Sequence, residues 1–192
     1  MIEKENRLEE YKVEIINKIK DRWKIDDLKE DSVFRAYRDF FWSVKVDPTK
    51  NRPASEALIR RILHETPFPK INTLVDSYNL ASAESCIPFA SFDTDKLMGT
   101  PVMREAKPGE AFLGIGMGKP LTLSGGEVVI QDSVKLIAVY PYRDADVSKV
   151  TTETNSIILM TCGVPGIDDQ LLKNAENVAI SNIFRFCGGS VA

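Results

Sequence analysis

The chain has 192 residues, 43% of them hydrophobic and 28% charged, with 25 lysines and arginines against 28 aspartates and glutamates. The apolar fraction is sufficient for a buried core, so a disordered chain or a disulfide scaffold is not expected. A formal net charge of −3 excludes the broad basic surface of a typical DNA-binding protein. We therefore expect no DNA partner, whereas a local basic face for RNA remains open.

The rarest reactive side chains limit the chemistry further. The single histidine, His64, excludes a multi-histidine metal site, and we expect neither a metal nor another cofactor. Cys86, Cys162 and Cys187 are far apart without a CxxC pair, which predicts reduced, buried thiols in a cytoplasmic protein. No run of 18 apolar residues predicts a membrane span, and the charged start of the chain does not resemble a secretory signal.

Four segments before residue 86 show apolar residues at every third or fourth position, which predicts four helices. Asp31 or Ser32 is the expected cap of the second helix, Pro53 lies near the first turn of the third, and the fourth follows Asn72. The apolar positions of the first two helices are Leu8, Tyr11, Ile15, Ile19 and Trp23, then Phe34, Tyr37, Phe41 and Val44.

After Cys86 the pattern changes to short apolar runs separated by glycine, proline, aspartate and serine, which is typical of strands joined by turns. The connections are too short for helices between strands, so a doubly wound parallel sheet is not expected. A last helix is predicted from about Asp168 to Gly188-Gly189. The fold class is therefore α+β, with strands expected within residues 87–92, 101–106, 126–132, 135–142 and 156–162.

Two polar groups are candidates for a site. Asn72, Asp76 and Asn79 fall on one face of the fourth predicted helix, since their spacing is i, i+4 and i+7. They either contact a ligand or serve as a cap, a first-turn acid and a bridge to a loop. The polar run at residues 140–156 either lines a pocket or is a solvated loop with local ion pairs. Its polar members are Arg143, Asp144, Asp146, Ser148, Lys149, Thr151, Thr154 and Asn155.

Four further features favour structural interpretations. The run GIGMGKP at residues 114–120 predicts a glycine-rich hairpin rather than a phosphate loop, because no helix follows it. Gly125-Gly126 predicts a turn, and His64 lies at a helix end, where its charge suits the dipole. Four basic residues lie between positions 52 and 70: Arg52, Arg60, Arg61 and Lys70. They are interpreted first as part of a solvated helix face, and a weak contact with RNA phosphate is the alternative.

Five segments in order suggest a family: NRPASEALIRRIL, INTLVDSYNLAS, IPFASFDTDKL, GEVVIQD and YRDADVSKVTTETNSIILM, within residues 51–162. Together they resemble the B-three/B-four editing module of the phenylalanyl-tRNA synthetase beta subunit. The resemblance implies a three-layer α+β module with a sandwich-like sheet core, N-terminal helices and a C-terminal helix. It divides the single domain 1–192 into a helical extension at 1–50, an editing-module-like core at 51–165 and a terminal helix at 166–192.

The family hydrolyses the ester of mischarged tRNA without a metal, so the resemblance implies a trans-acting aminoacyl-tRNA deacylase. The alternative is a binding module for an amino acid or tRNA that kept the fold and lost hydrolysis. The chain departs from the family at Ala90, where a histidine is frequent, so the family's tyrosine specificity does not carry over. Asp76 or Asp144 is the expected catalytic group, and the expected substrate contacts are Asn72, Asn79, Gly125, Gly126, Thr154, Asn155 and Ser156.

Overall fold

The computed structural model describes residues 2–191, with side chains from residue 7 onward, and the chain forms two compact units. The helical unit comprises Met1–Tyr37, Pro53–Phe89 and Thr161–Ala192, and the sheet unit comprises Arg38–Arg52 and Ala90–Met160. Each unit is therefore assembled from segments that are distant in sequence. Within residues 2–191, no helix is both long enough and apolar enough to cross a membrane.

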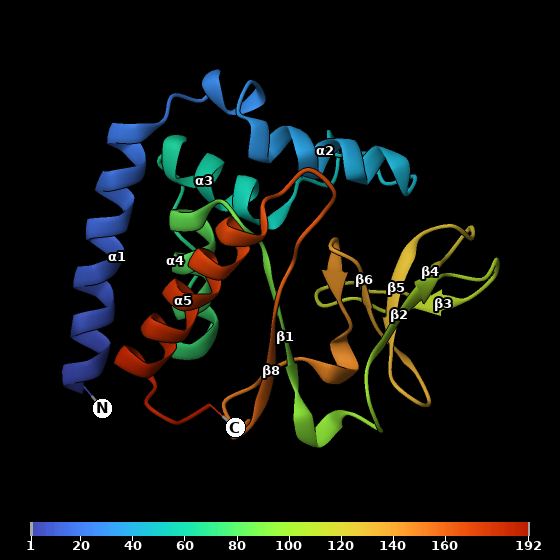
Figure 1. Ribbon diagram of the computed structural model, residues 1–192. Helices are drawn as coiled ribbons and strands as arrows, with labels where there is room; N and C mark the ends of the chain where they lie inside the picture. The colour runs from blue at the N-terminus through green and yellow to red at the C-terminus, as the bar shows by residue number, and fades with distance from the viewer. Residues whose placement is uncertain (1, 192) are drawn as a thin grey trace. The chain divides into compact units, whose positions relative to one another are not determined.

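The helical unit packs four helices around one apolar core: α1 (Ile2–Arg22), α3 (Ala54–Leu63), α4 (Thr73–Ser85) and α5 (Asp169–Phe186). Helices α1 and α5 both contact α4 and run beside it in Figure 1. Ile15, Ile59 and Leu80 are fully buried here, because the apolar stripe of each helix faces the same core. Helix α2 (Ser32–Ser43) and the short helix η1 (Asp27–Lys29) complete the described helices up to residue 53.

The starts of three helices agree with those predicted from sequence, and a side-chain cap lies at each of them. Asn72 is the N-cap of α4, and its side chain accepts a hydrogen bond from Val75 N at 2.9 Å. Asp168 caps α5, and Asp31 accepts from Val33 N at 3.0 Å at the start of α2. Each side chain satisfies a backbone N–H that the helix itself leaves without a partner. The five predicted helices are confirmed, with bounds close to those expected.

The sheet unit contains a four-stranded antiparallel sheet with strand order β2-β5-β6-β7. Its strands are β2 (Val102–Glu105), β5 (Val128–Gln131), β6 (Leu136–Val139) and β7 (Arg143–Asp144). A two-stranded hairpin, β3 (Ala111–Phe112) and β4 (Leu121–Thr122), contributes Phe112 to the core of this sheet. The unit also contains the short helices η2 (Thr94–Lys96) and η3 (Asp146–Ser148).

Strand register defines two faces of this sheet, since side chains alternate along a strand. One face carries Arg104, Val129, Val139 and Arg143, which oppose one another from β2 to β7; we call it the Arg104 face. The other carries Ile130, Ala138 and Asp144 in the same way, and we call it the Asp144 face. A bulge between Ile130 and Gln131 shifts the register of β5 and β6 by one residue.

Strands β1 (Phe89–Asp93) and β8 (Ile157–Thr161) pair separately in a two-stranded sheet. Cys162 N donates to Pro88 O at one end and Thr94 N to Ser156 O at the other, so the pair is antiparallel. All five residues of β1 are buried. The buried, apolar character of this strand is the reason that its two polar side chains, Ser91 and Asp93, matter for the site.

The α+β class is confirmed, and so are strands within all five predicted segments. Residues 114–120 join β3 to β4 and no helix follows them, which confirms the hairpin interpretation. The structure adds the two-residue strands β3, β4 and β7, which are too short for an apolar alternation to reveal. Cys86 and Cys162 are buried as expected, whereas Cys187 is exposed. The division of the chain at residues 50/51 and 165/166 stays a prediction.

Candidate functional site

Asp144 is a carboxylate without a cationic partner in the part of the chain that the structure describes. It lies on β7 opposite Ala138, and the one hydrogen bond to its carboxylate comes from Ser91 N, at 3.5 Å. Burial raises the pKa of the Asp144 carboxyl to about 7, because the weak Ser91 contact offsets little of the lost solvation. A group with this pKa exchanges a proton near neutral pH, which is what general acid–base catalysis requires.

Ser91, which contacts this carboxylate through its N–H, has unused hydrogen-bonding capacity in its side chain. Its residue is 3% exposed, and its Oγ has no hydrogen-bond partner in the described structure. A buried hydroxyl without a partner costs free energy on the order of 1–3 kcal/mol, so such groups in native proteins need a reason. A bound ligand or a water molecule would supply the missing partner.

A second contact of β1 lies two residues further along the strand. Thr154 Oγ1 donates to Asp93 Oδ2 at 2.6 Å and accepts from Thr151 N at 3.0 Å. This hydrogen bond, followed by the Lys96 ammonium at 3.2 Å, holds the pKa of Asp93 below its ordinary value. Ser91 and Asp93 are two residues apart and therefore lie on the same face of β1. Asp144 and Thr154 thus contact this strand two residues from one another.

Replacing Thr154 with valine is expected to destabilise the protein by about 1.5–3 kcal/mol, because the buried Asp93 carboxylate loses its shortest hydrogen bond. Urea unfolding at pH 7 measures this loss, and Thr154→Ser is the control because it keeps the hydroxyl. The folded-state pKa of Asp93 is lowered, so its contribution is present at neutral pH and disappears as the pH falls through that pKa. Equal stability of the valine and serine variants at pH 7 would contradict a stabilising hydrogen bond from the Thr154 hydroxyl to Asp93.

The remaining predicted residues of this loop are at its surface. Asn155 and Ser156 are exposed; Asn155 Nδ2 donates to Glu153 O at 3.0 Å, and Ser156 O accepts from Thr94 N at 3.1 Å. These contacts hold the loop between η3 and β8 against the end of β1. Contact of the two side chains with a substrate stays a prediction.

The two glycines occupy the turn before β5. Gly125 and Gly126 have φ of +90° and +89°, a backbone region that other residues rarely adopt, so the predicted turn is confirmed. A Cβ on Gly125 would come within 2.8 Å of Pro108 Cγ, and Lys45 Nζ donates to Gly125 O at 3.2 Å. No contact on this turn reaches Asp144 or Thr154 in the described structure, so a substrate role for the glycines stays a prediction.

The polar face of α4 belongs to the helical unit, where two of its three members have local partners. Asn72 is the N-cap of α4, which confirms the interpretation of this residue as a helix cap. Asp76 is 2% exposed, accepts from Ile71 N at 2.9 Å and lies 3.8 Å from Lys12 Nζ. Burial raises the pKa of Asp76, while the Ile71 N–H and the Lys12 ammonium act in the opposite direction. Asn79 is partly exposed near the middle of the helix.

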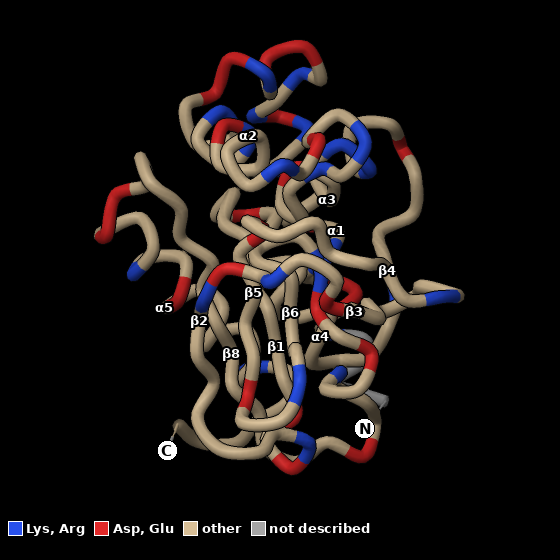
Figure 2. Tube along the Cα trace, turned by 90° about the vertical axis from the view of Figure 1, so that its right-hand side faces the viewer, with Lys and Arg blue, Asp and Glu red and all other residues tan. Residues whose placement is uncertain are grey.

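The four basic candidates are divided between the units, with Arg52 in the sheet unit and the others in the helical unit. Arg60 Nε donates to Glu56 Oε1 at 2.6 Å, and Arg61 Nη2 donates to Pro67 O at 2.9 Å. Figure 2 shows acidic and basic segments interspersed along the trace of each unit. Both guanidinium groups are thus used within the protein, and binding of RNA by these residues or by Lys70 stays a prediction.

His64 is the C-cap residue of α3, with its N–H donated to Arg60 O at 2.9 Å, which confirms its place at a helix end. Within residues 2–191, no group of three or more histidine, cysteine, aspartate or glutamate side chains is arranged to hold a metal ion. Ser91 is the residue that sequence reasoning missed. A serine inside the apolar run IPFASF was the available signal, since a buried strand seldom accepts an unsatisfied hydroxyl.

Comparison with known proteins identifies relatives of this chain. The family model of the B3/4 domain matches residues 36–188. Phenylalanine--tRNA ligase beta subunits are similar in sequence. The subunit of Rhodopseudomonas palustris is 26% identical over 168 residues, which cover 76% of this chain and 21% of that subunit. The subunit of Geobacter sulfurreducens is 32% identical over 108 residues, which cover 56% of this chain and 13% of that subunit. The chain therefore spans about a fifth or less of these subunits.

A solved structure agrees with the sequence relatives at the level of the fold. An N-terminal fragment of the phenylalanyl-tRNA synthetase beta subunit from Pyrococcus horikoshii superimposes with a TM-score of 0.50 and 13% identity, covering 84% of this chain and 72% of the fragment. At this identity the likeness concerns the fold alone. The family model extends over most of the sequence, and the chain belongs to the B3/4 domain family.

Proposed function

We propose that this protein hydrolyses the ester bond of mischarged aminoacyl-tRNA in trans, with Asp144 as the general base. Two observations support the proposal. The chain belongs to a family whose related sequences are tRNA ligase subunits, and its sheet unit contains a desolvated carboxyl with a pKa of about 7. The second observation carries the chemistry, because a carboxylate with an ordinary pKa is a weak base at neutral pH.

The proposed reaction needs one water molecule and no covalent intermediate. Asp144 takes a proton from water as the water oxygen attacks the ester carbonyl carbon. The tetrahedral intermediate then breaks the bond to the ribose oxygen, which receives the proton, so the products are a free amino acid and a tRNA hydroxyl. An aminoacyl ester is already reactive, so positioning of the water supplies much of the rate enhancement. A second hydrolytic site of this kind corrects errors between amino acids that differ by a small apolar group.

Ser91 is the proposed partner of Asp144 in this reaction. Its Oγ has no hydrogen-bond partner in the described structure, and its N–H contacts the Asp144 carboxylate at 3.5 Å, so the two groups are neighbours. The hydroxyl would donate to the substrate carbonyl oxygen, on which negative charge develops during attack. Ser91→Ala is therefore expected to lower hydrolysis without abolishing it, since the base remains in place.

Contact with tRNA is proposed to be local, because the net charge of −3 gives no broad attraction for phosphate. Arg52 and Lys70 are exposed, and with Arg61 they are the proposed phosphate contacts. Arg60 is a weaker candidate, since its guanidinium is held by the buried Glu56. Cytoplasmic aminoacyl-tRNA is the substrate that fits this proposal.

The test is a panel of mischarged tRNAs, with correctly charged phenylalanyl-tRNA as the comparison. Wild-type protein is expected to release the amino acid from at least one mischarged tRNA faster than buffer does, and Ser91→Ala is expected to release it more slowly. Ester that stays intact across the whole panel would exclude hydrolysis. Intact ester together with saturable binding of aminoacyl-tRNA would instead support the alternative, a non-catalytic binding module.

A further inference from the structure

The sheet unit contains a pocket of about 530 Å³ that is separate from Asp144. Its walls include Arg104, Glu110, Asp132 and Lys135, and Ala145 forms part of its lining. Ala145 follows Asp144 directly, so the two side chains leave the strand on opposite sides. Arg104 likewise belongs to the opposite face of the sheet from Asp144. The pocket therefore lies on the Arg104 face and takes no part in the proposed hydrolysis.

Two ion pairs form the polar wall of this pocket. Arg104 Nη2 donates to Glu110 Oε1 at 2.6 Å, and Arg104 Nη1 donates to Glu110 Oε2 at 2.9 Å. Lys135 Nζ donates to Asp132 Oδ2 and to Lys96 O. Both carboxylates have a pKa lowered to about 2: in Glu110 by Arg104, and in Asp132 because Lys135 and backbone N–H donors outweigh the burial that acts in the opposite direction. Both carboxylates are therefore ionised at neutral pH.

These groups keep a specific set of unused hydrogen-bonding positions in the described structure. Arg104 Nη2 has a second N–H, and Lys135 Nζ has a third, because each nitrogen uses fewer donors than it carries. Glu110 Oε1 accepts only from Arg104, so it keeps a lone pair. Asp132 accepts four hydrogen bonds, from Met98 N, Val134 N, Lys135 N and Lys135 Nζ, and has no position left. The pocket thus offers two cationic donors and one anionic acceptor.

This set matches a zwitterion. A carboxylate accepts from the two donors, and an ammonium group donates to Glu110 Oε1, so no charge of the ligand is left without a partner. A phosphate or another anion matches poorly, because the two lining carboxylates balance the two cations and repel further negative charge. Most of the remaining lining is apolar, with Phe112 and Leu136 at the core of the sheet and with exposed Leu113, Val134 and Val147. Gln131 and Ser133 are its two uncharged polar residues.

We propose that this pocket binds a free amino acid with an apolar side chain, its carboxylate on Arg104 and Lys135 and its ammonium on Glu110. The volume is within the range of small-molecule sites and exceeds that of any one amino acid, so water fills the remainder. The apolar residues of the wall receive the side chain. The site is independent of the proposed deacylase activity, since it uses the other face of the sheet.

Calorimetric titration of the purified full chain with L-leucine at pH 7 tests the proposal. Two probes each lack one charge of leucine: 4-methylpentanoate lacks the ammonium, and 3-methylbutylamine lacks the carboxylate. Leucine is expected to bind with Kd of about 1 mM or tighter, and each probe at least about tenfold more weakly, because one charged wall stays unmatched. Equal binding of leucine and either probe would exclude recognition of a zwitterion.

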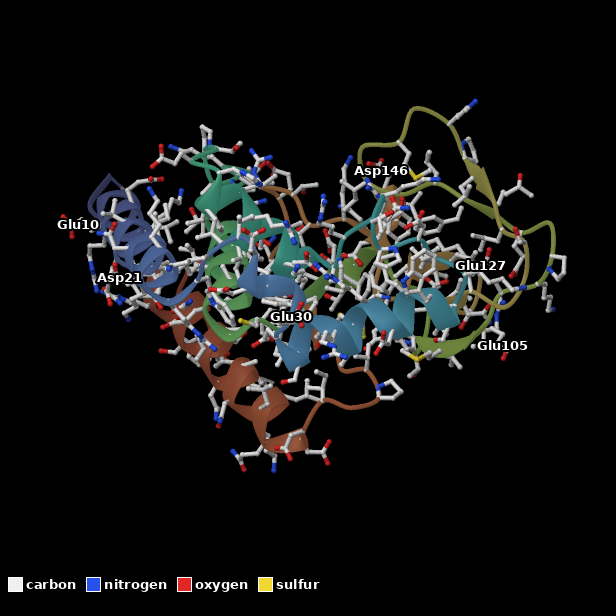
Figure 3. All side chains as sticks on the ribbon, turned by 90° about the horizontal axis from the view of Figure 1, so that it is seen from above. Glu10, Asp21, Glu30, Glu105, Glu127 and Asp146 are labelled. Atoms are coloured by element: carbon white, nitrogen blue, oxygen red, sulfur yellow. The ribbon has the colours of Figure 1, made fainter. Side chains whose placement is uncertain are left out.

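Matched variants place the binding in the pocket. Val147 is 51% exposed and lines the pocket, beside Asp146, which Figure 3 labels, whereas Val102 is 54% exposed and does not line it. Val147→Asp is expected to weaken leucine binding at least about tenfold by repelling its carboxylate, and Val102→Asp by less than about twofold. If Val147→Asp does not fold, Val134→Asp is the second variant, since Val134 is 69% exposed in the same lining.

Asp144→Asn separates this site from the proposed hydrolytic site. It is expected to leave the Kd of leucine unchanged, because Asp144 lies on the other face of the sheet. Loss of leucine binding in Asp144→Asn, with binding retained in the folded aspartate variant of the pocket, would overturn the proposal and place the amino acid at Asp144. No heat of binding by wild-type protein at millimolar leucine would overturn it as well, whatever the deacylation panel shows.

Discussion

Asp144→Asn is expected to lower ester hydrolysis by roughly 10²–10⁴-fold, the range typical for loss of a positioned general base. Asparagine has nearly the same size and keeps an oxygen for Ser91 N, so the geometry of β7 is retained. The amide does not accept a proton from water. The measurement is the rate of amino-acid release from the most sensitive mischarged tRNA, corrected for release in buffer.

The pH dependence of wild-type hydrolysis is expected to follow the ionisation of Asp144. Because the pKa of Asp144 is raised to about 7, the fraction of carboxylate, and with it the corrected rate, rises as the pH increases from 5.5 to about 8. Asp144→Asn is expected to lose this rise. A pH profile of the corrected rate that is the same in the variant and the wild type would exclude Asp144 as the base.

The same substitution is expected to stabilise the protein at alkaline pH. A carboxyl whose folded-state pKa is raised opposes folding once the unfolded chain ionises, so its cost builds up between pH 3.8 and about 7 and is complete above pH 7. Asp144→Asn removes this cost, on the order of 4 kcal/mol at pH 8, and changes stability little at pH 4. Asp146→Asn is the control, because Asp146 pairs with Lys149 at 2.7 Å and its side chain is 39% exposed.

Asp132→Ala is expected to be the most destabilising substitution in the sheet unit, costing at least about 3 kcal/mol. The carboxylate accepts from three backbone N–H groups, those of Met98, Val134 and Lys135, at 2.9 Å each, and all three lose this acceptor. The side chain thereby closes the β5–β6 turn and fixes Met98, 34 residues earlier in the chain. Urea unfolding at pH 7 measures the loss.

Two comparisons test this explanation of Asp132. Asp132→Asn is expected to lose less than Asp132→Ala, because its amide oxygen keeps part of the acceptor set, and Asp146→Ala is expected to cost under about 0.5 kcal/mol as an exposed aspartate with one partner. The pKa of Asp132 is lowered to about 2, so its contribution is complete above pH 4 and is lost as the pH falls through 2. Equal stability of Asp132→Ala and Asp132→Asn would contradict the explanation that Asp132 stabilises the sheet unit as a hydrogen-bond acceptor.

Elements with strong local signals could be predicted from the sequence. The apolar stripe from Leu8 to Trp23 gave α1, and the cap residues Asn72 and Asp168 marked the starts of α4 and α5. Strands β3, β4 and β7 could not be predicted, because two residues are too few for an alternation and their pairing depends on distant partners. The composition of each compact unit likewise depends on contacts between remote segments.

The candidate site shows the same limit. Asp144 and Thr154 were candidates because they lie in a polar loop between apolar runs, but their environments are set by Ser91 and Asp93, 53 and 61 residues away. A raised pKa follows from burial and from the absence of a nearby cation, and neither is readable from the sequence around residue 144. The zwitterion pocket is also invisible locally, because Arg104 and Lys135 meet only through the strand order of the sheet.

The interleaved segments of the two units have a consequence for synthesis on the ribosome. The sheet unit ends at Met160, whereas the helical unit needs the segment from Thr161 onward, which contains α5. Every segment of the sheet unit therefore leaves the ribosome before the helical unit has received its last helix. Until then α1 and α4 expose the apolar surface that α5 later covers, including the surroundings of Leu80 and Ala83. The helical unit, although it contains the first helix of the chain, is therefore completed only after all of the sheet unit has been synthesised.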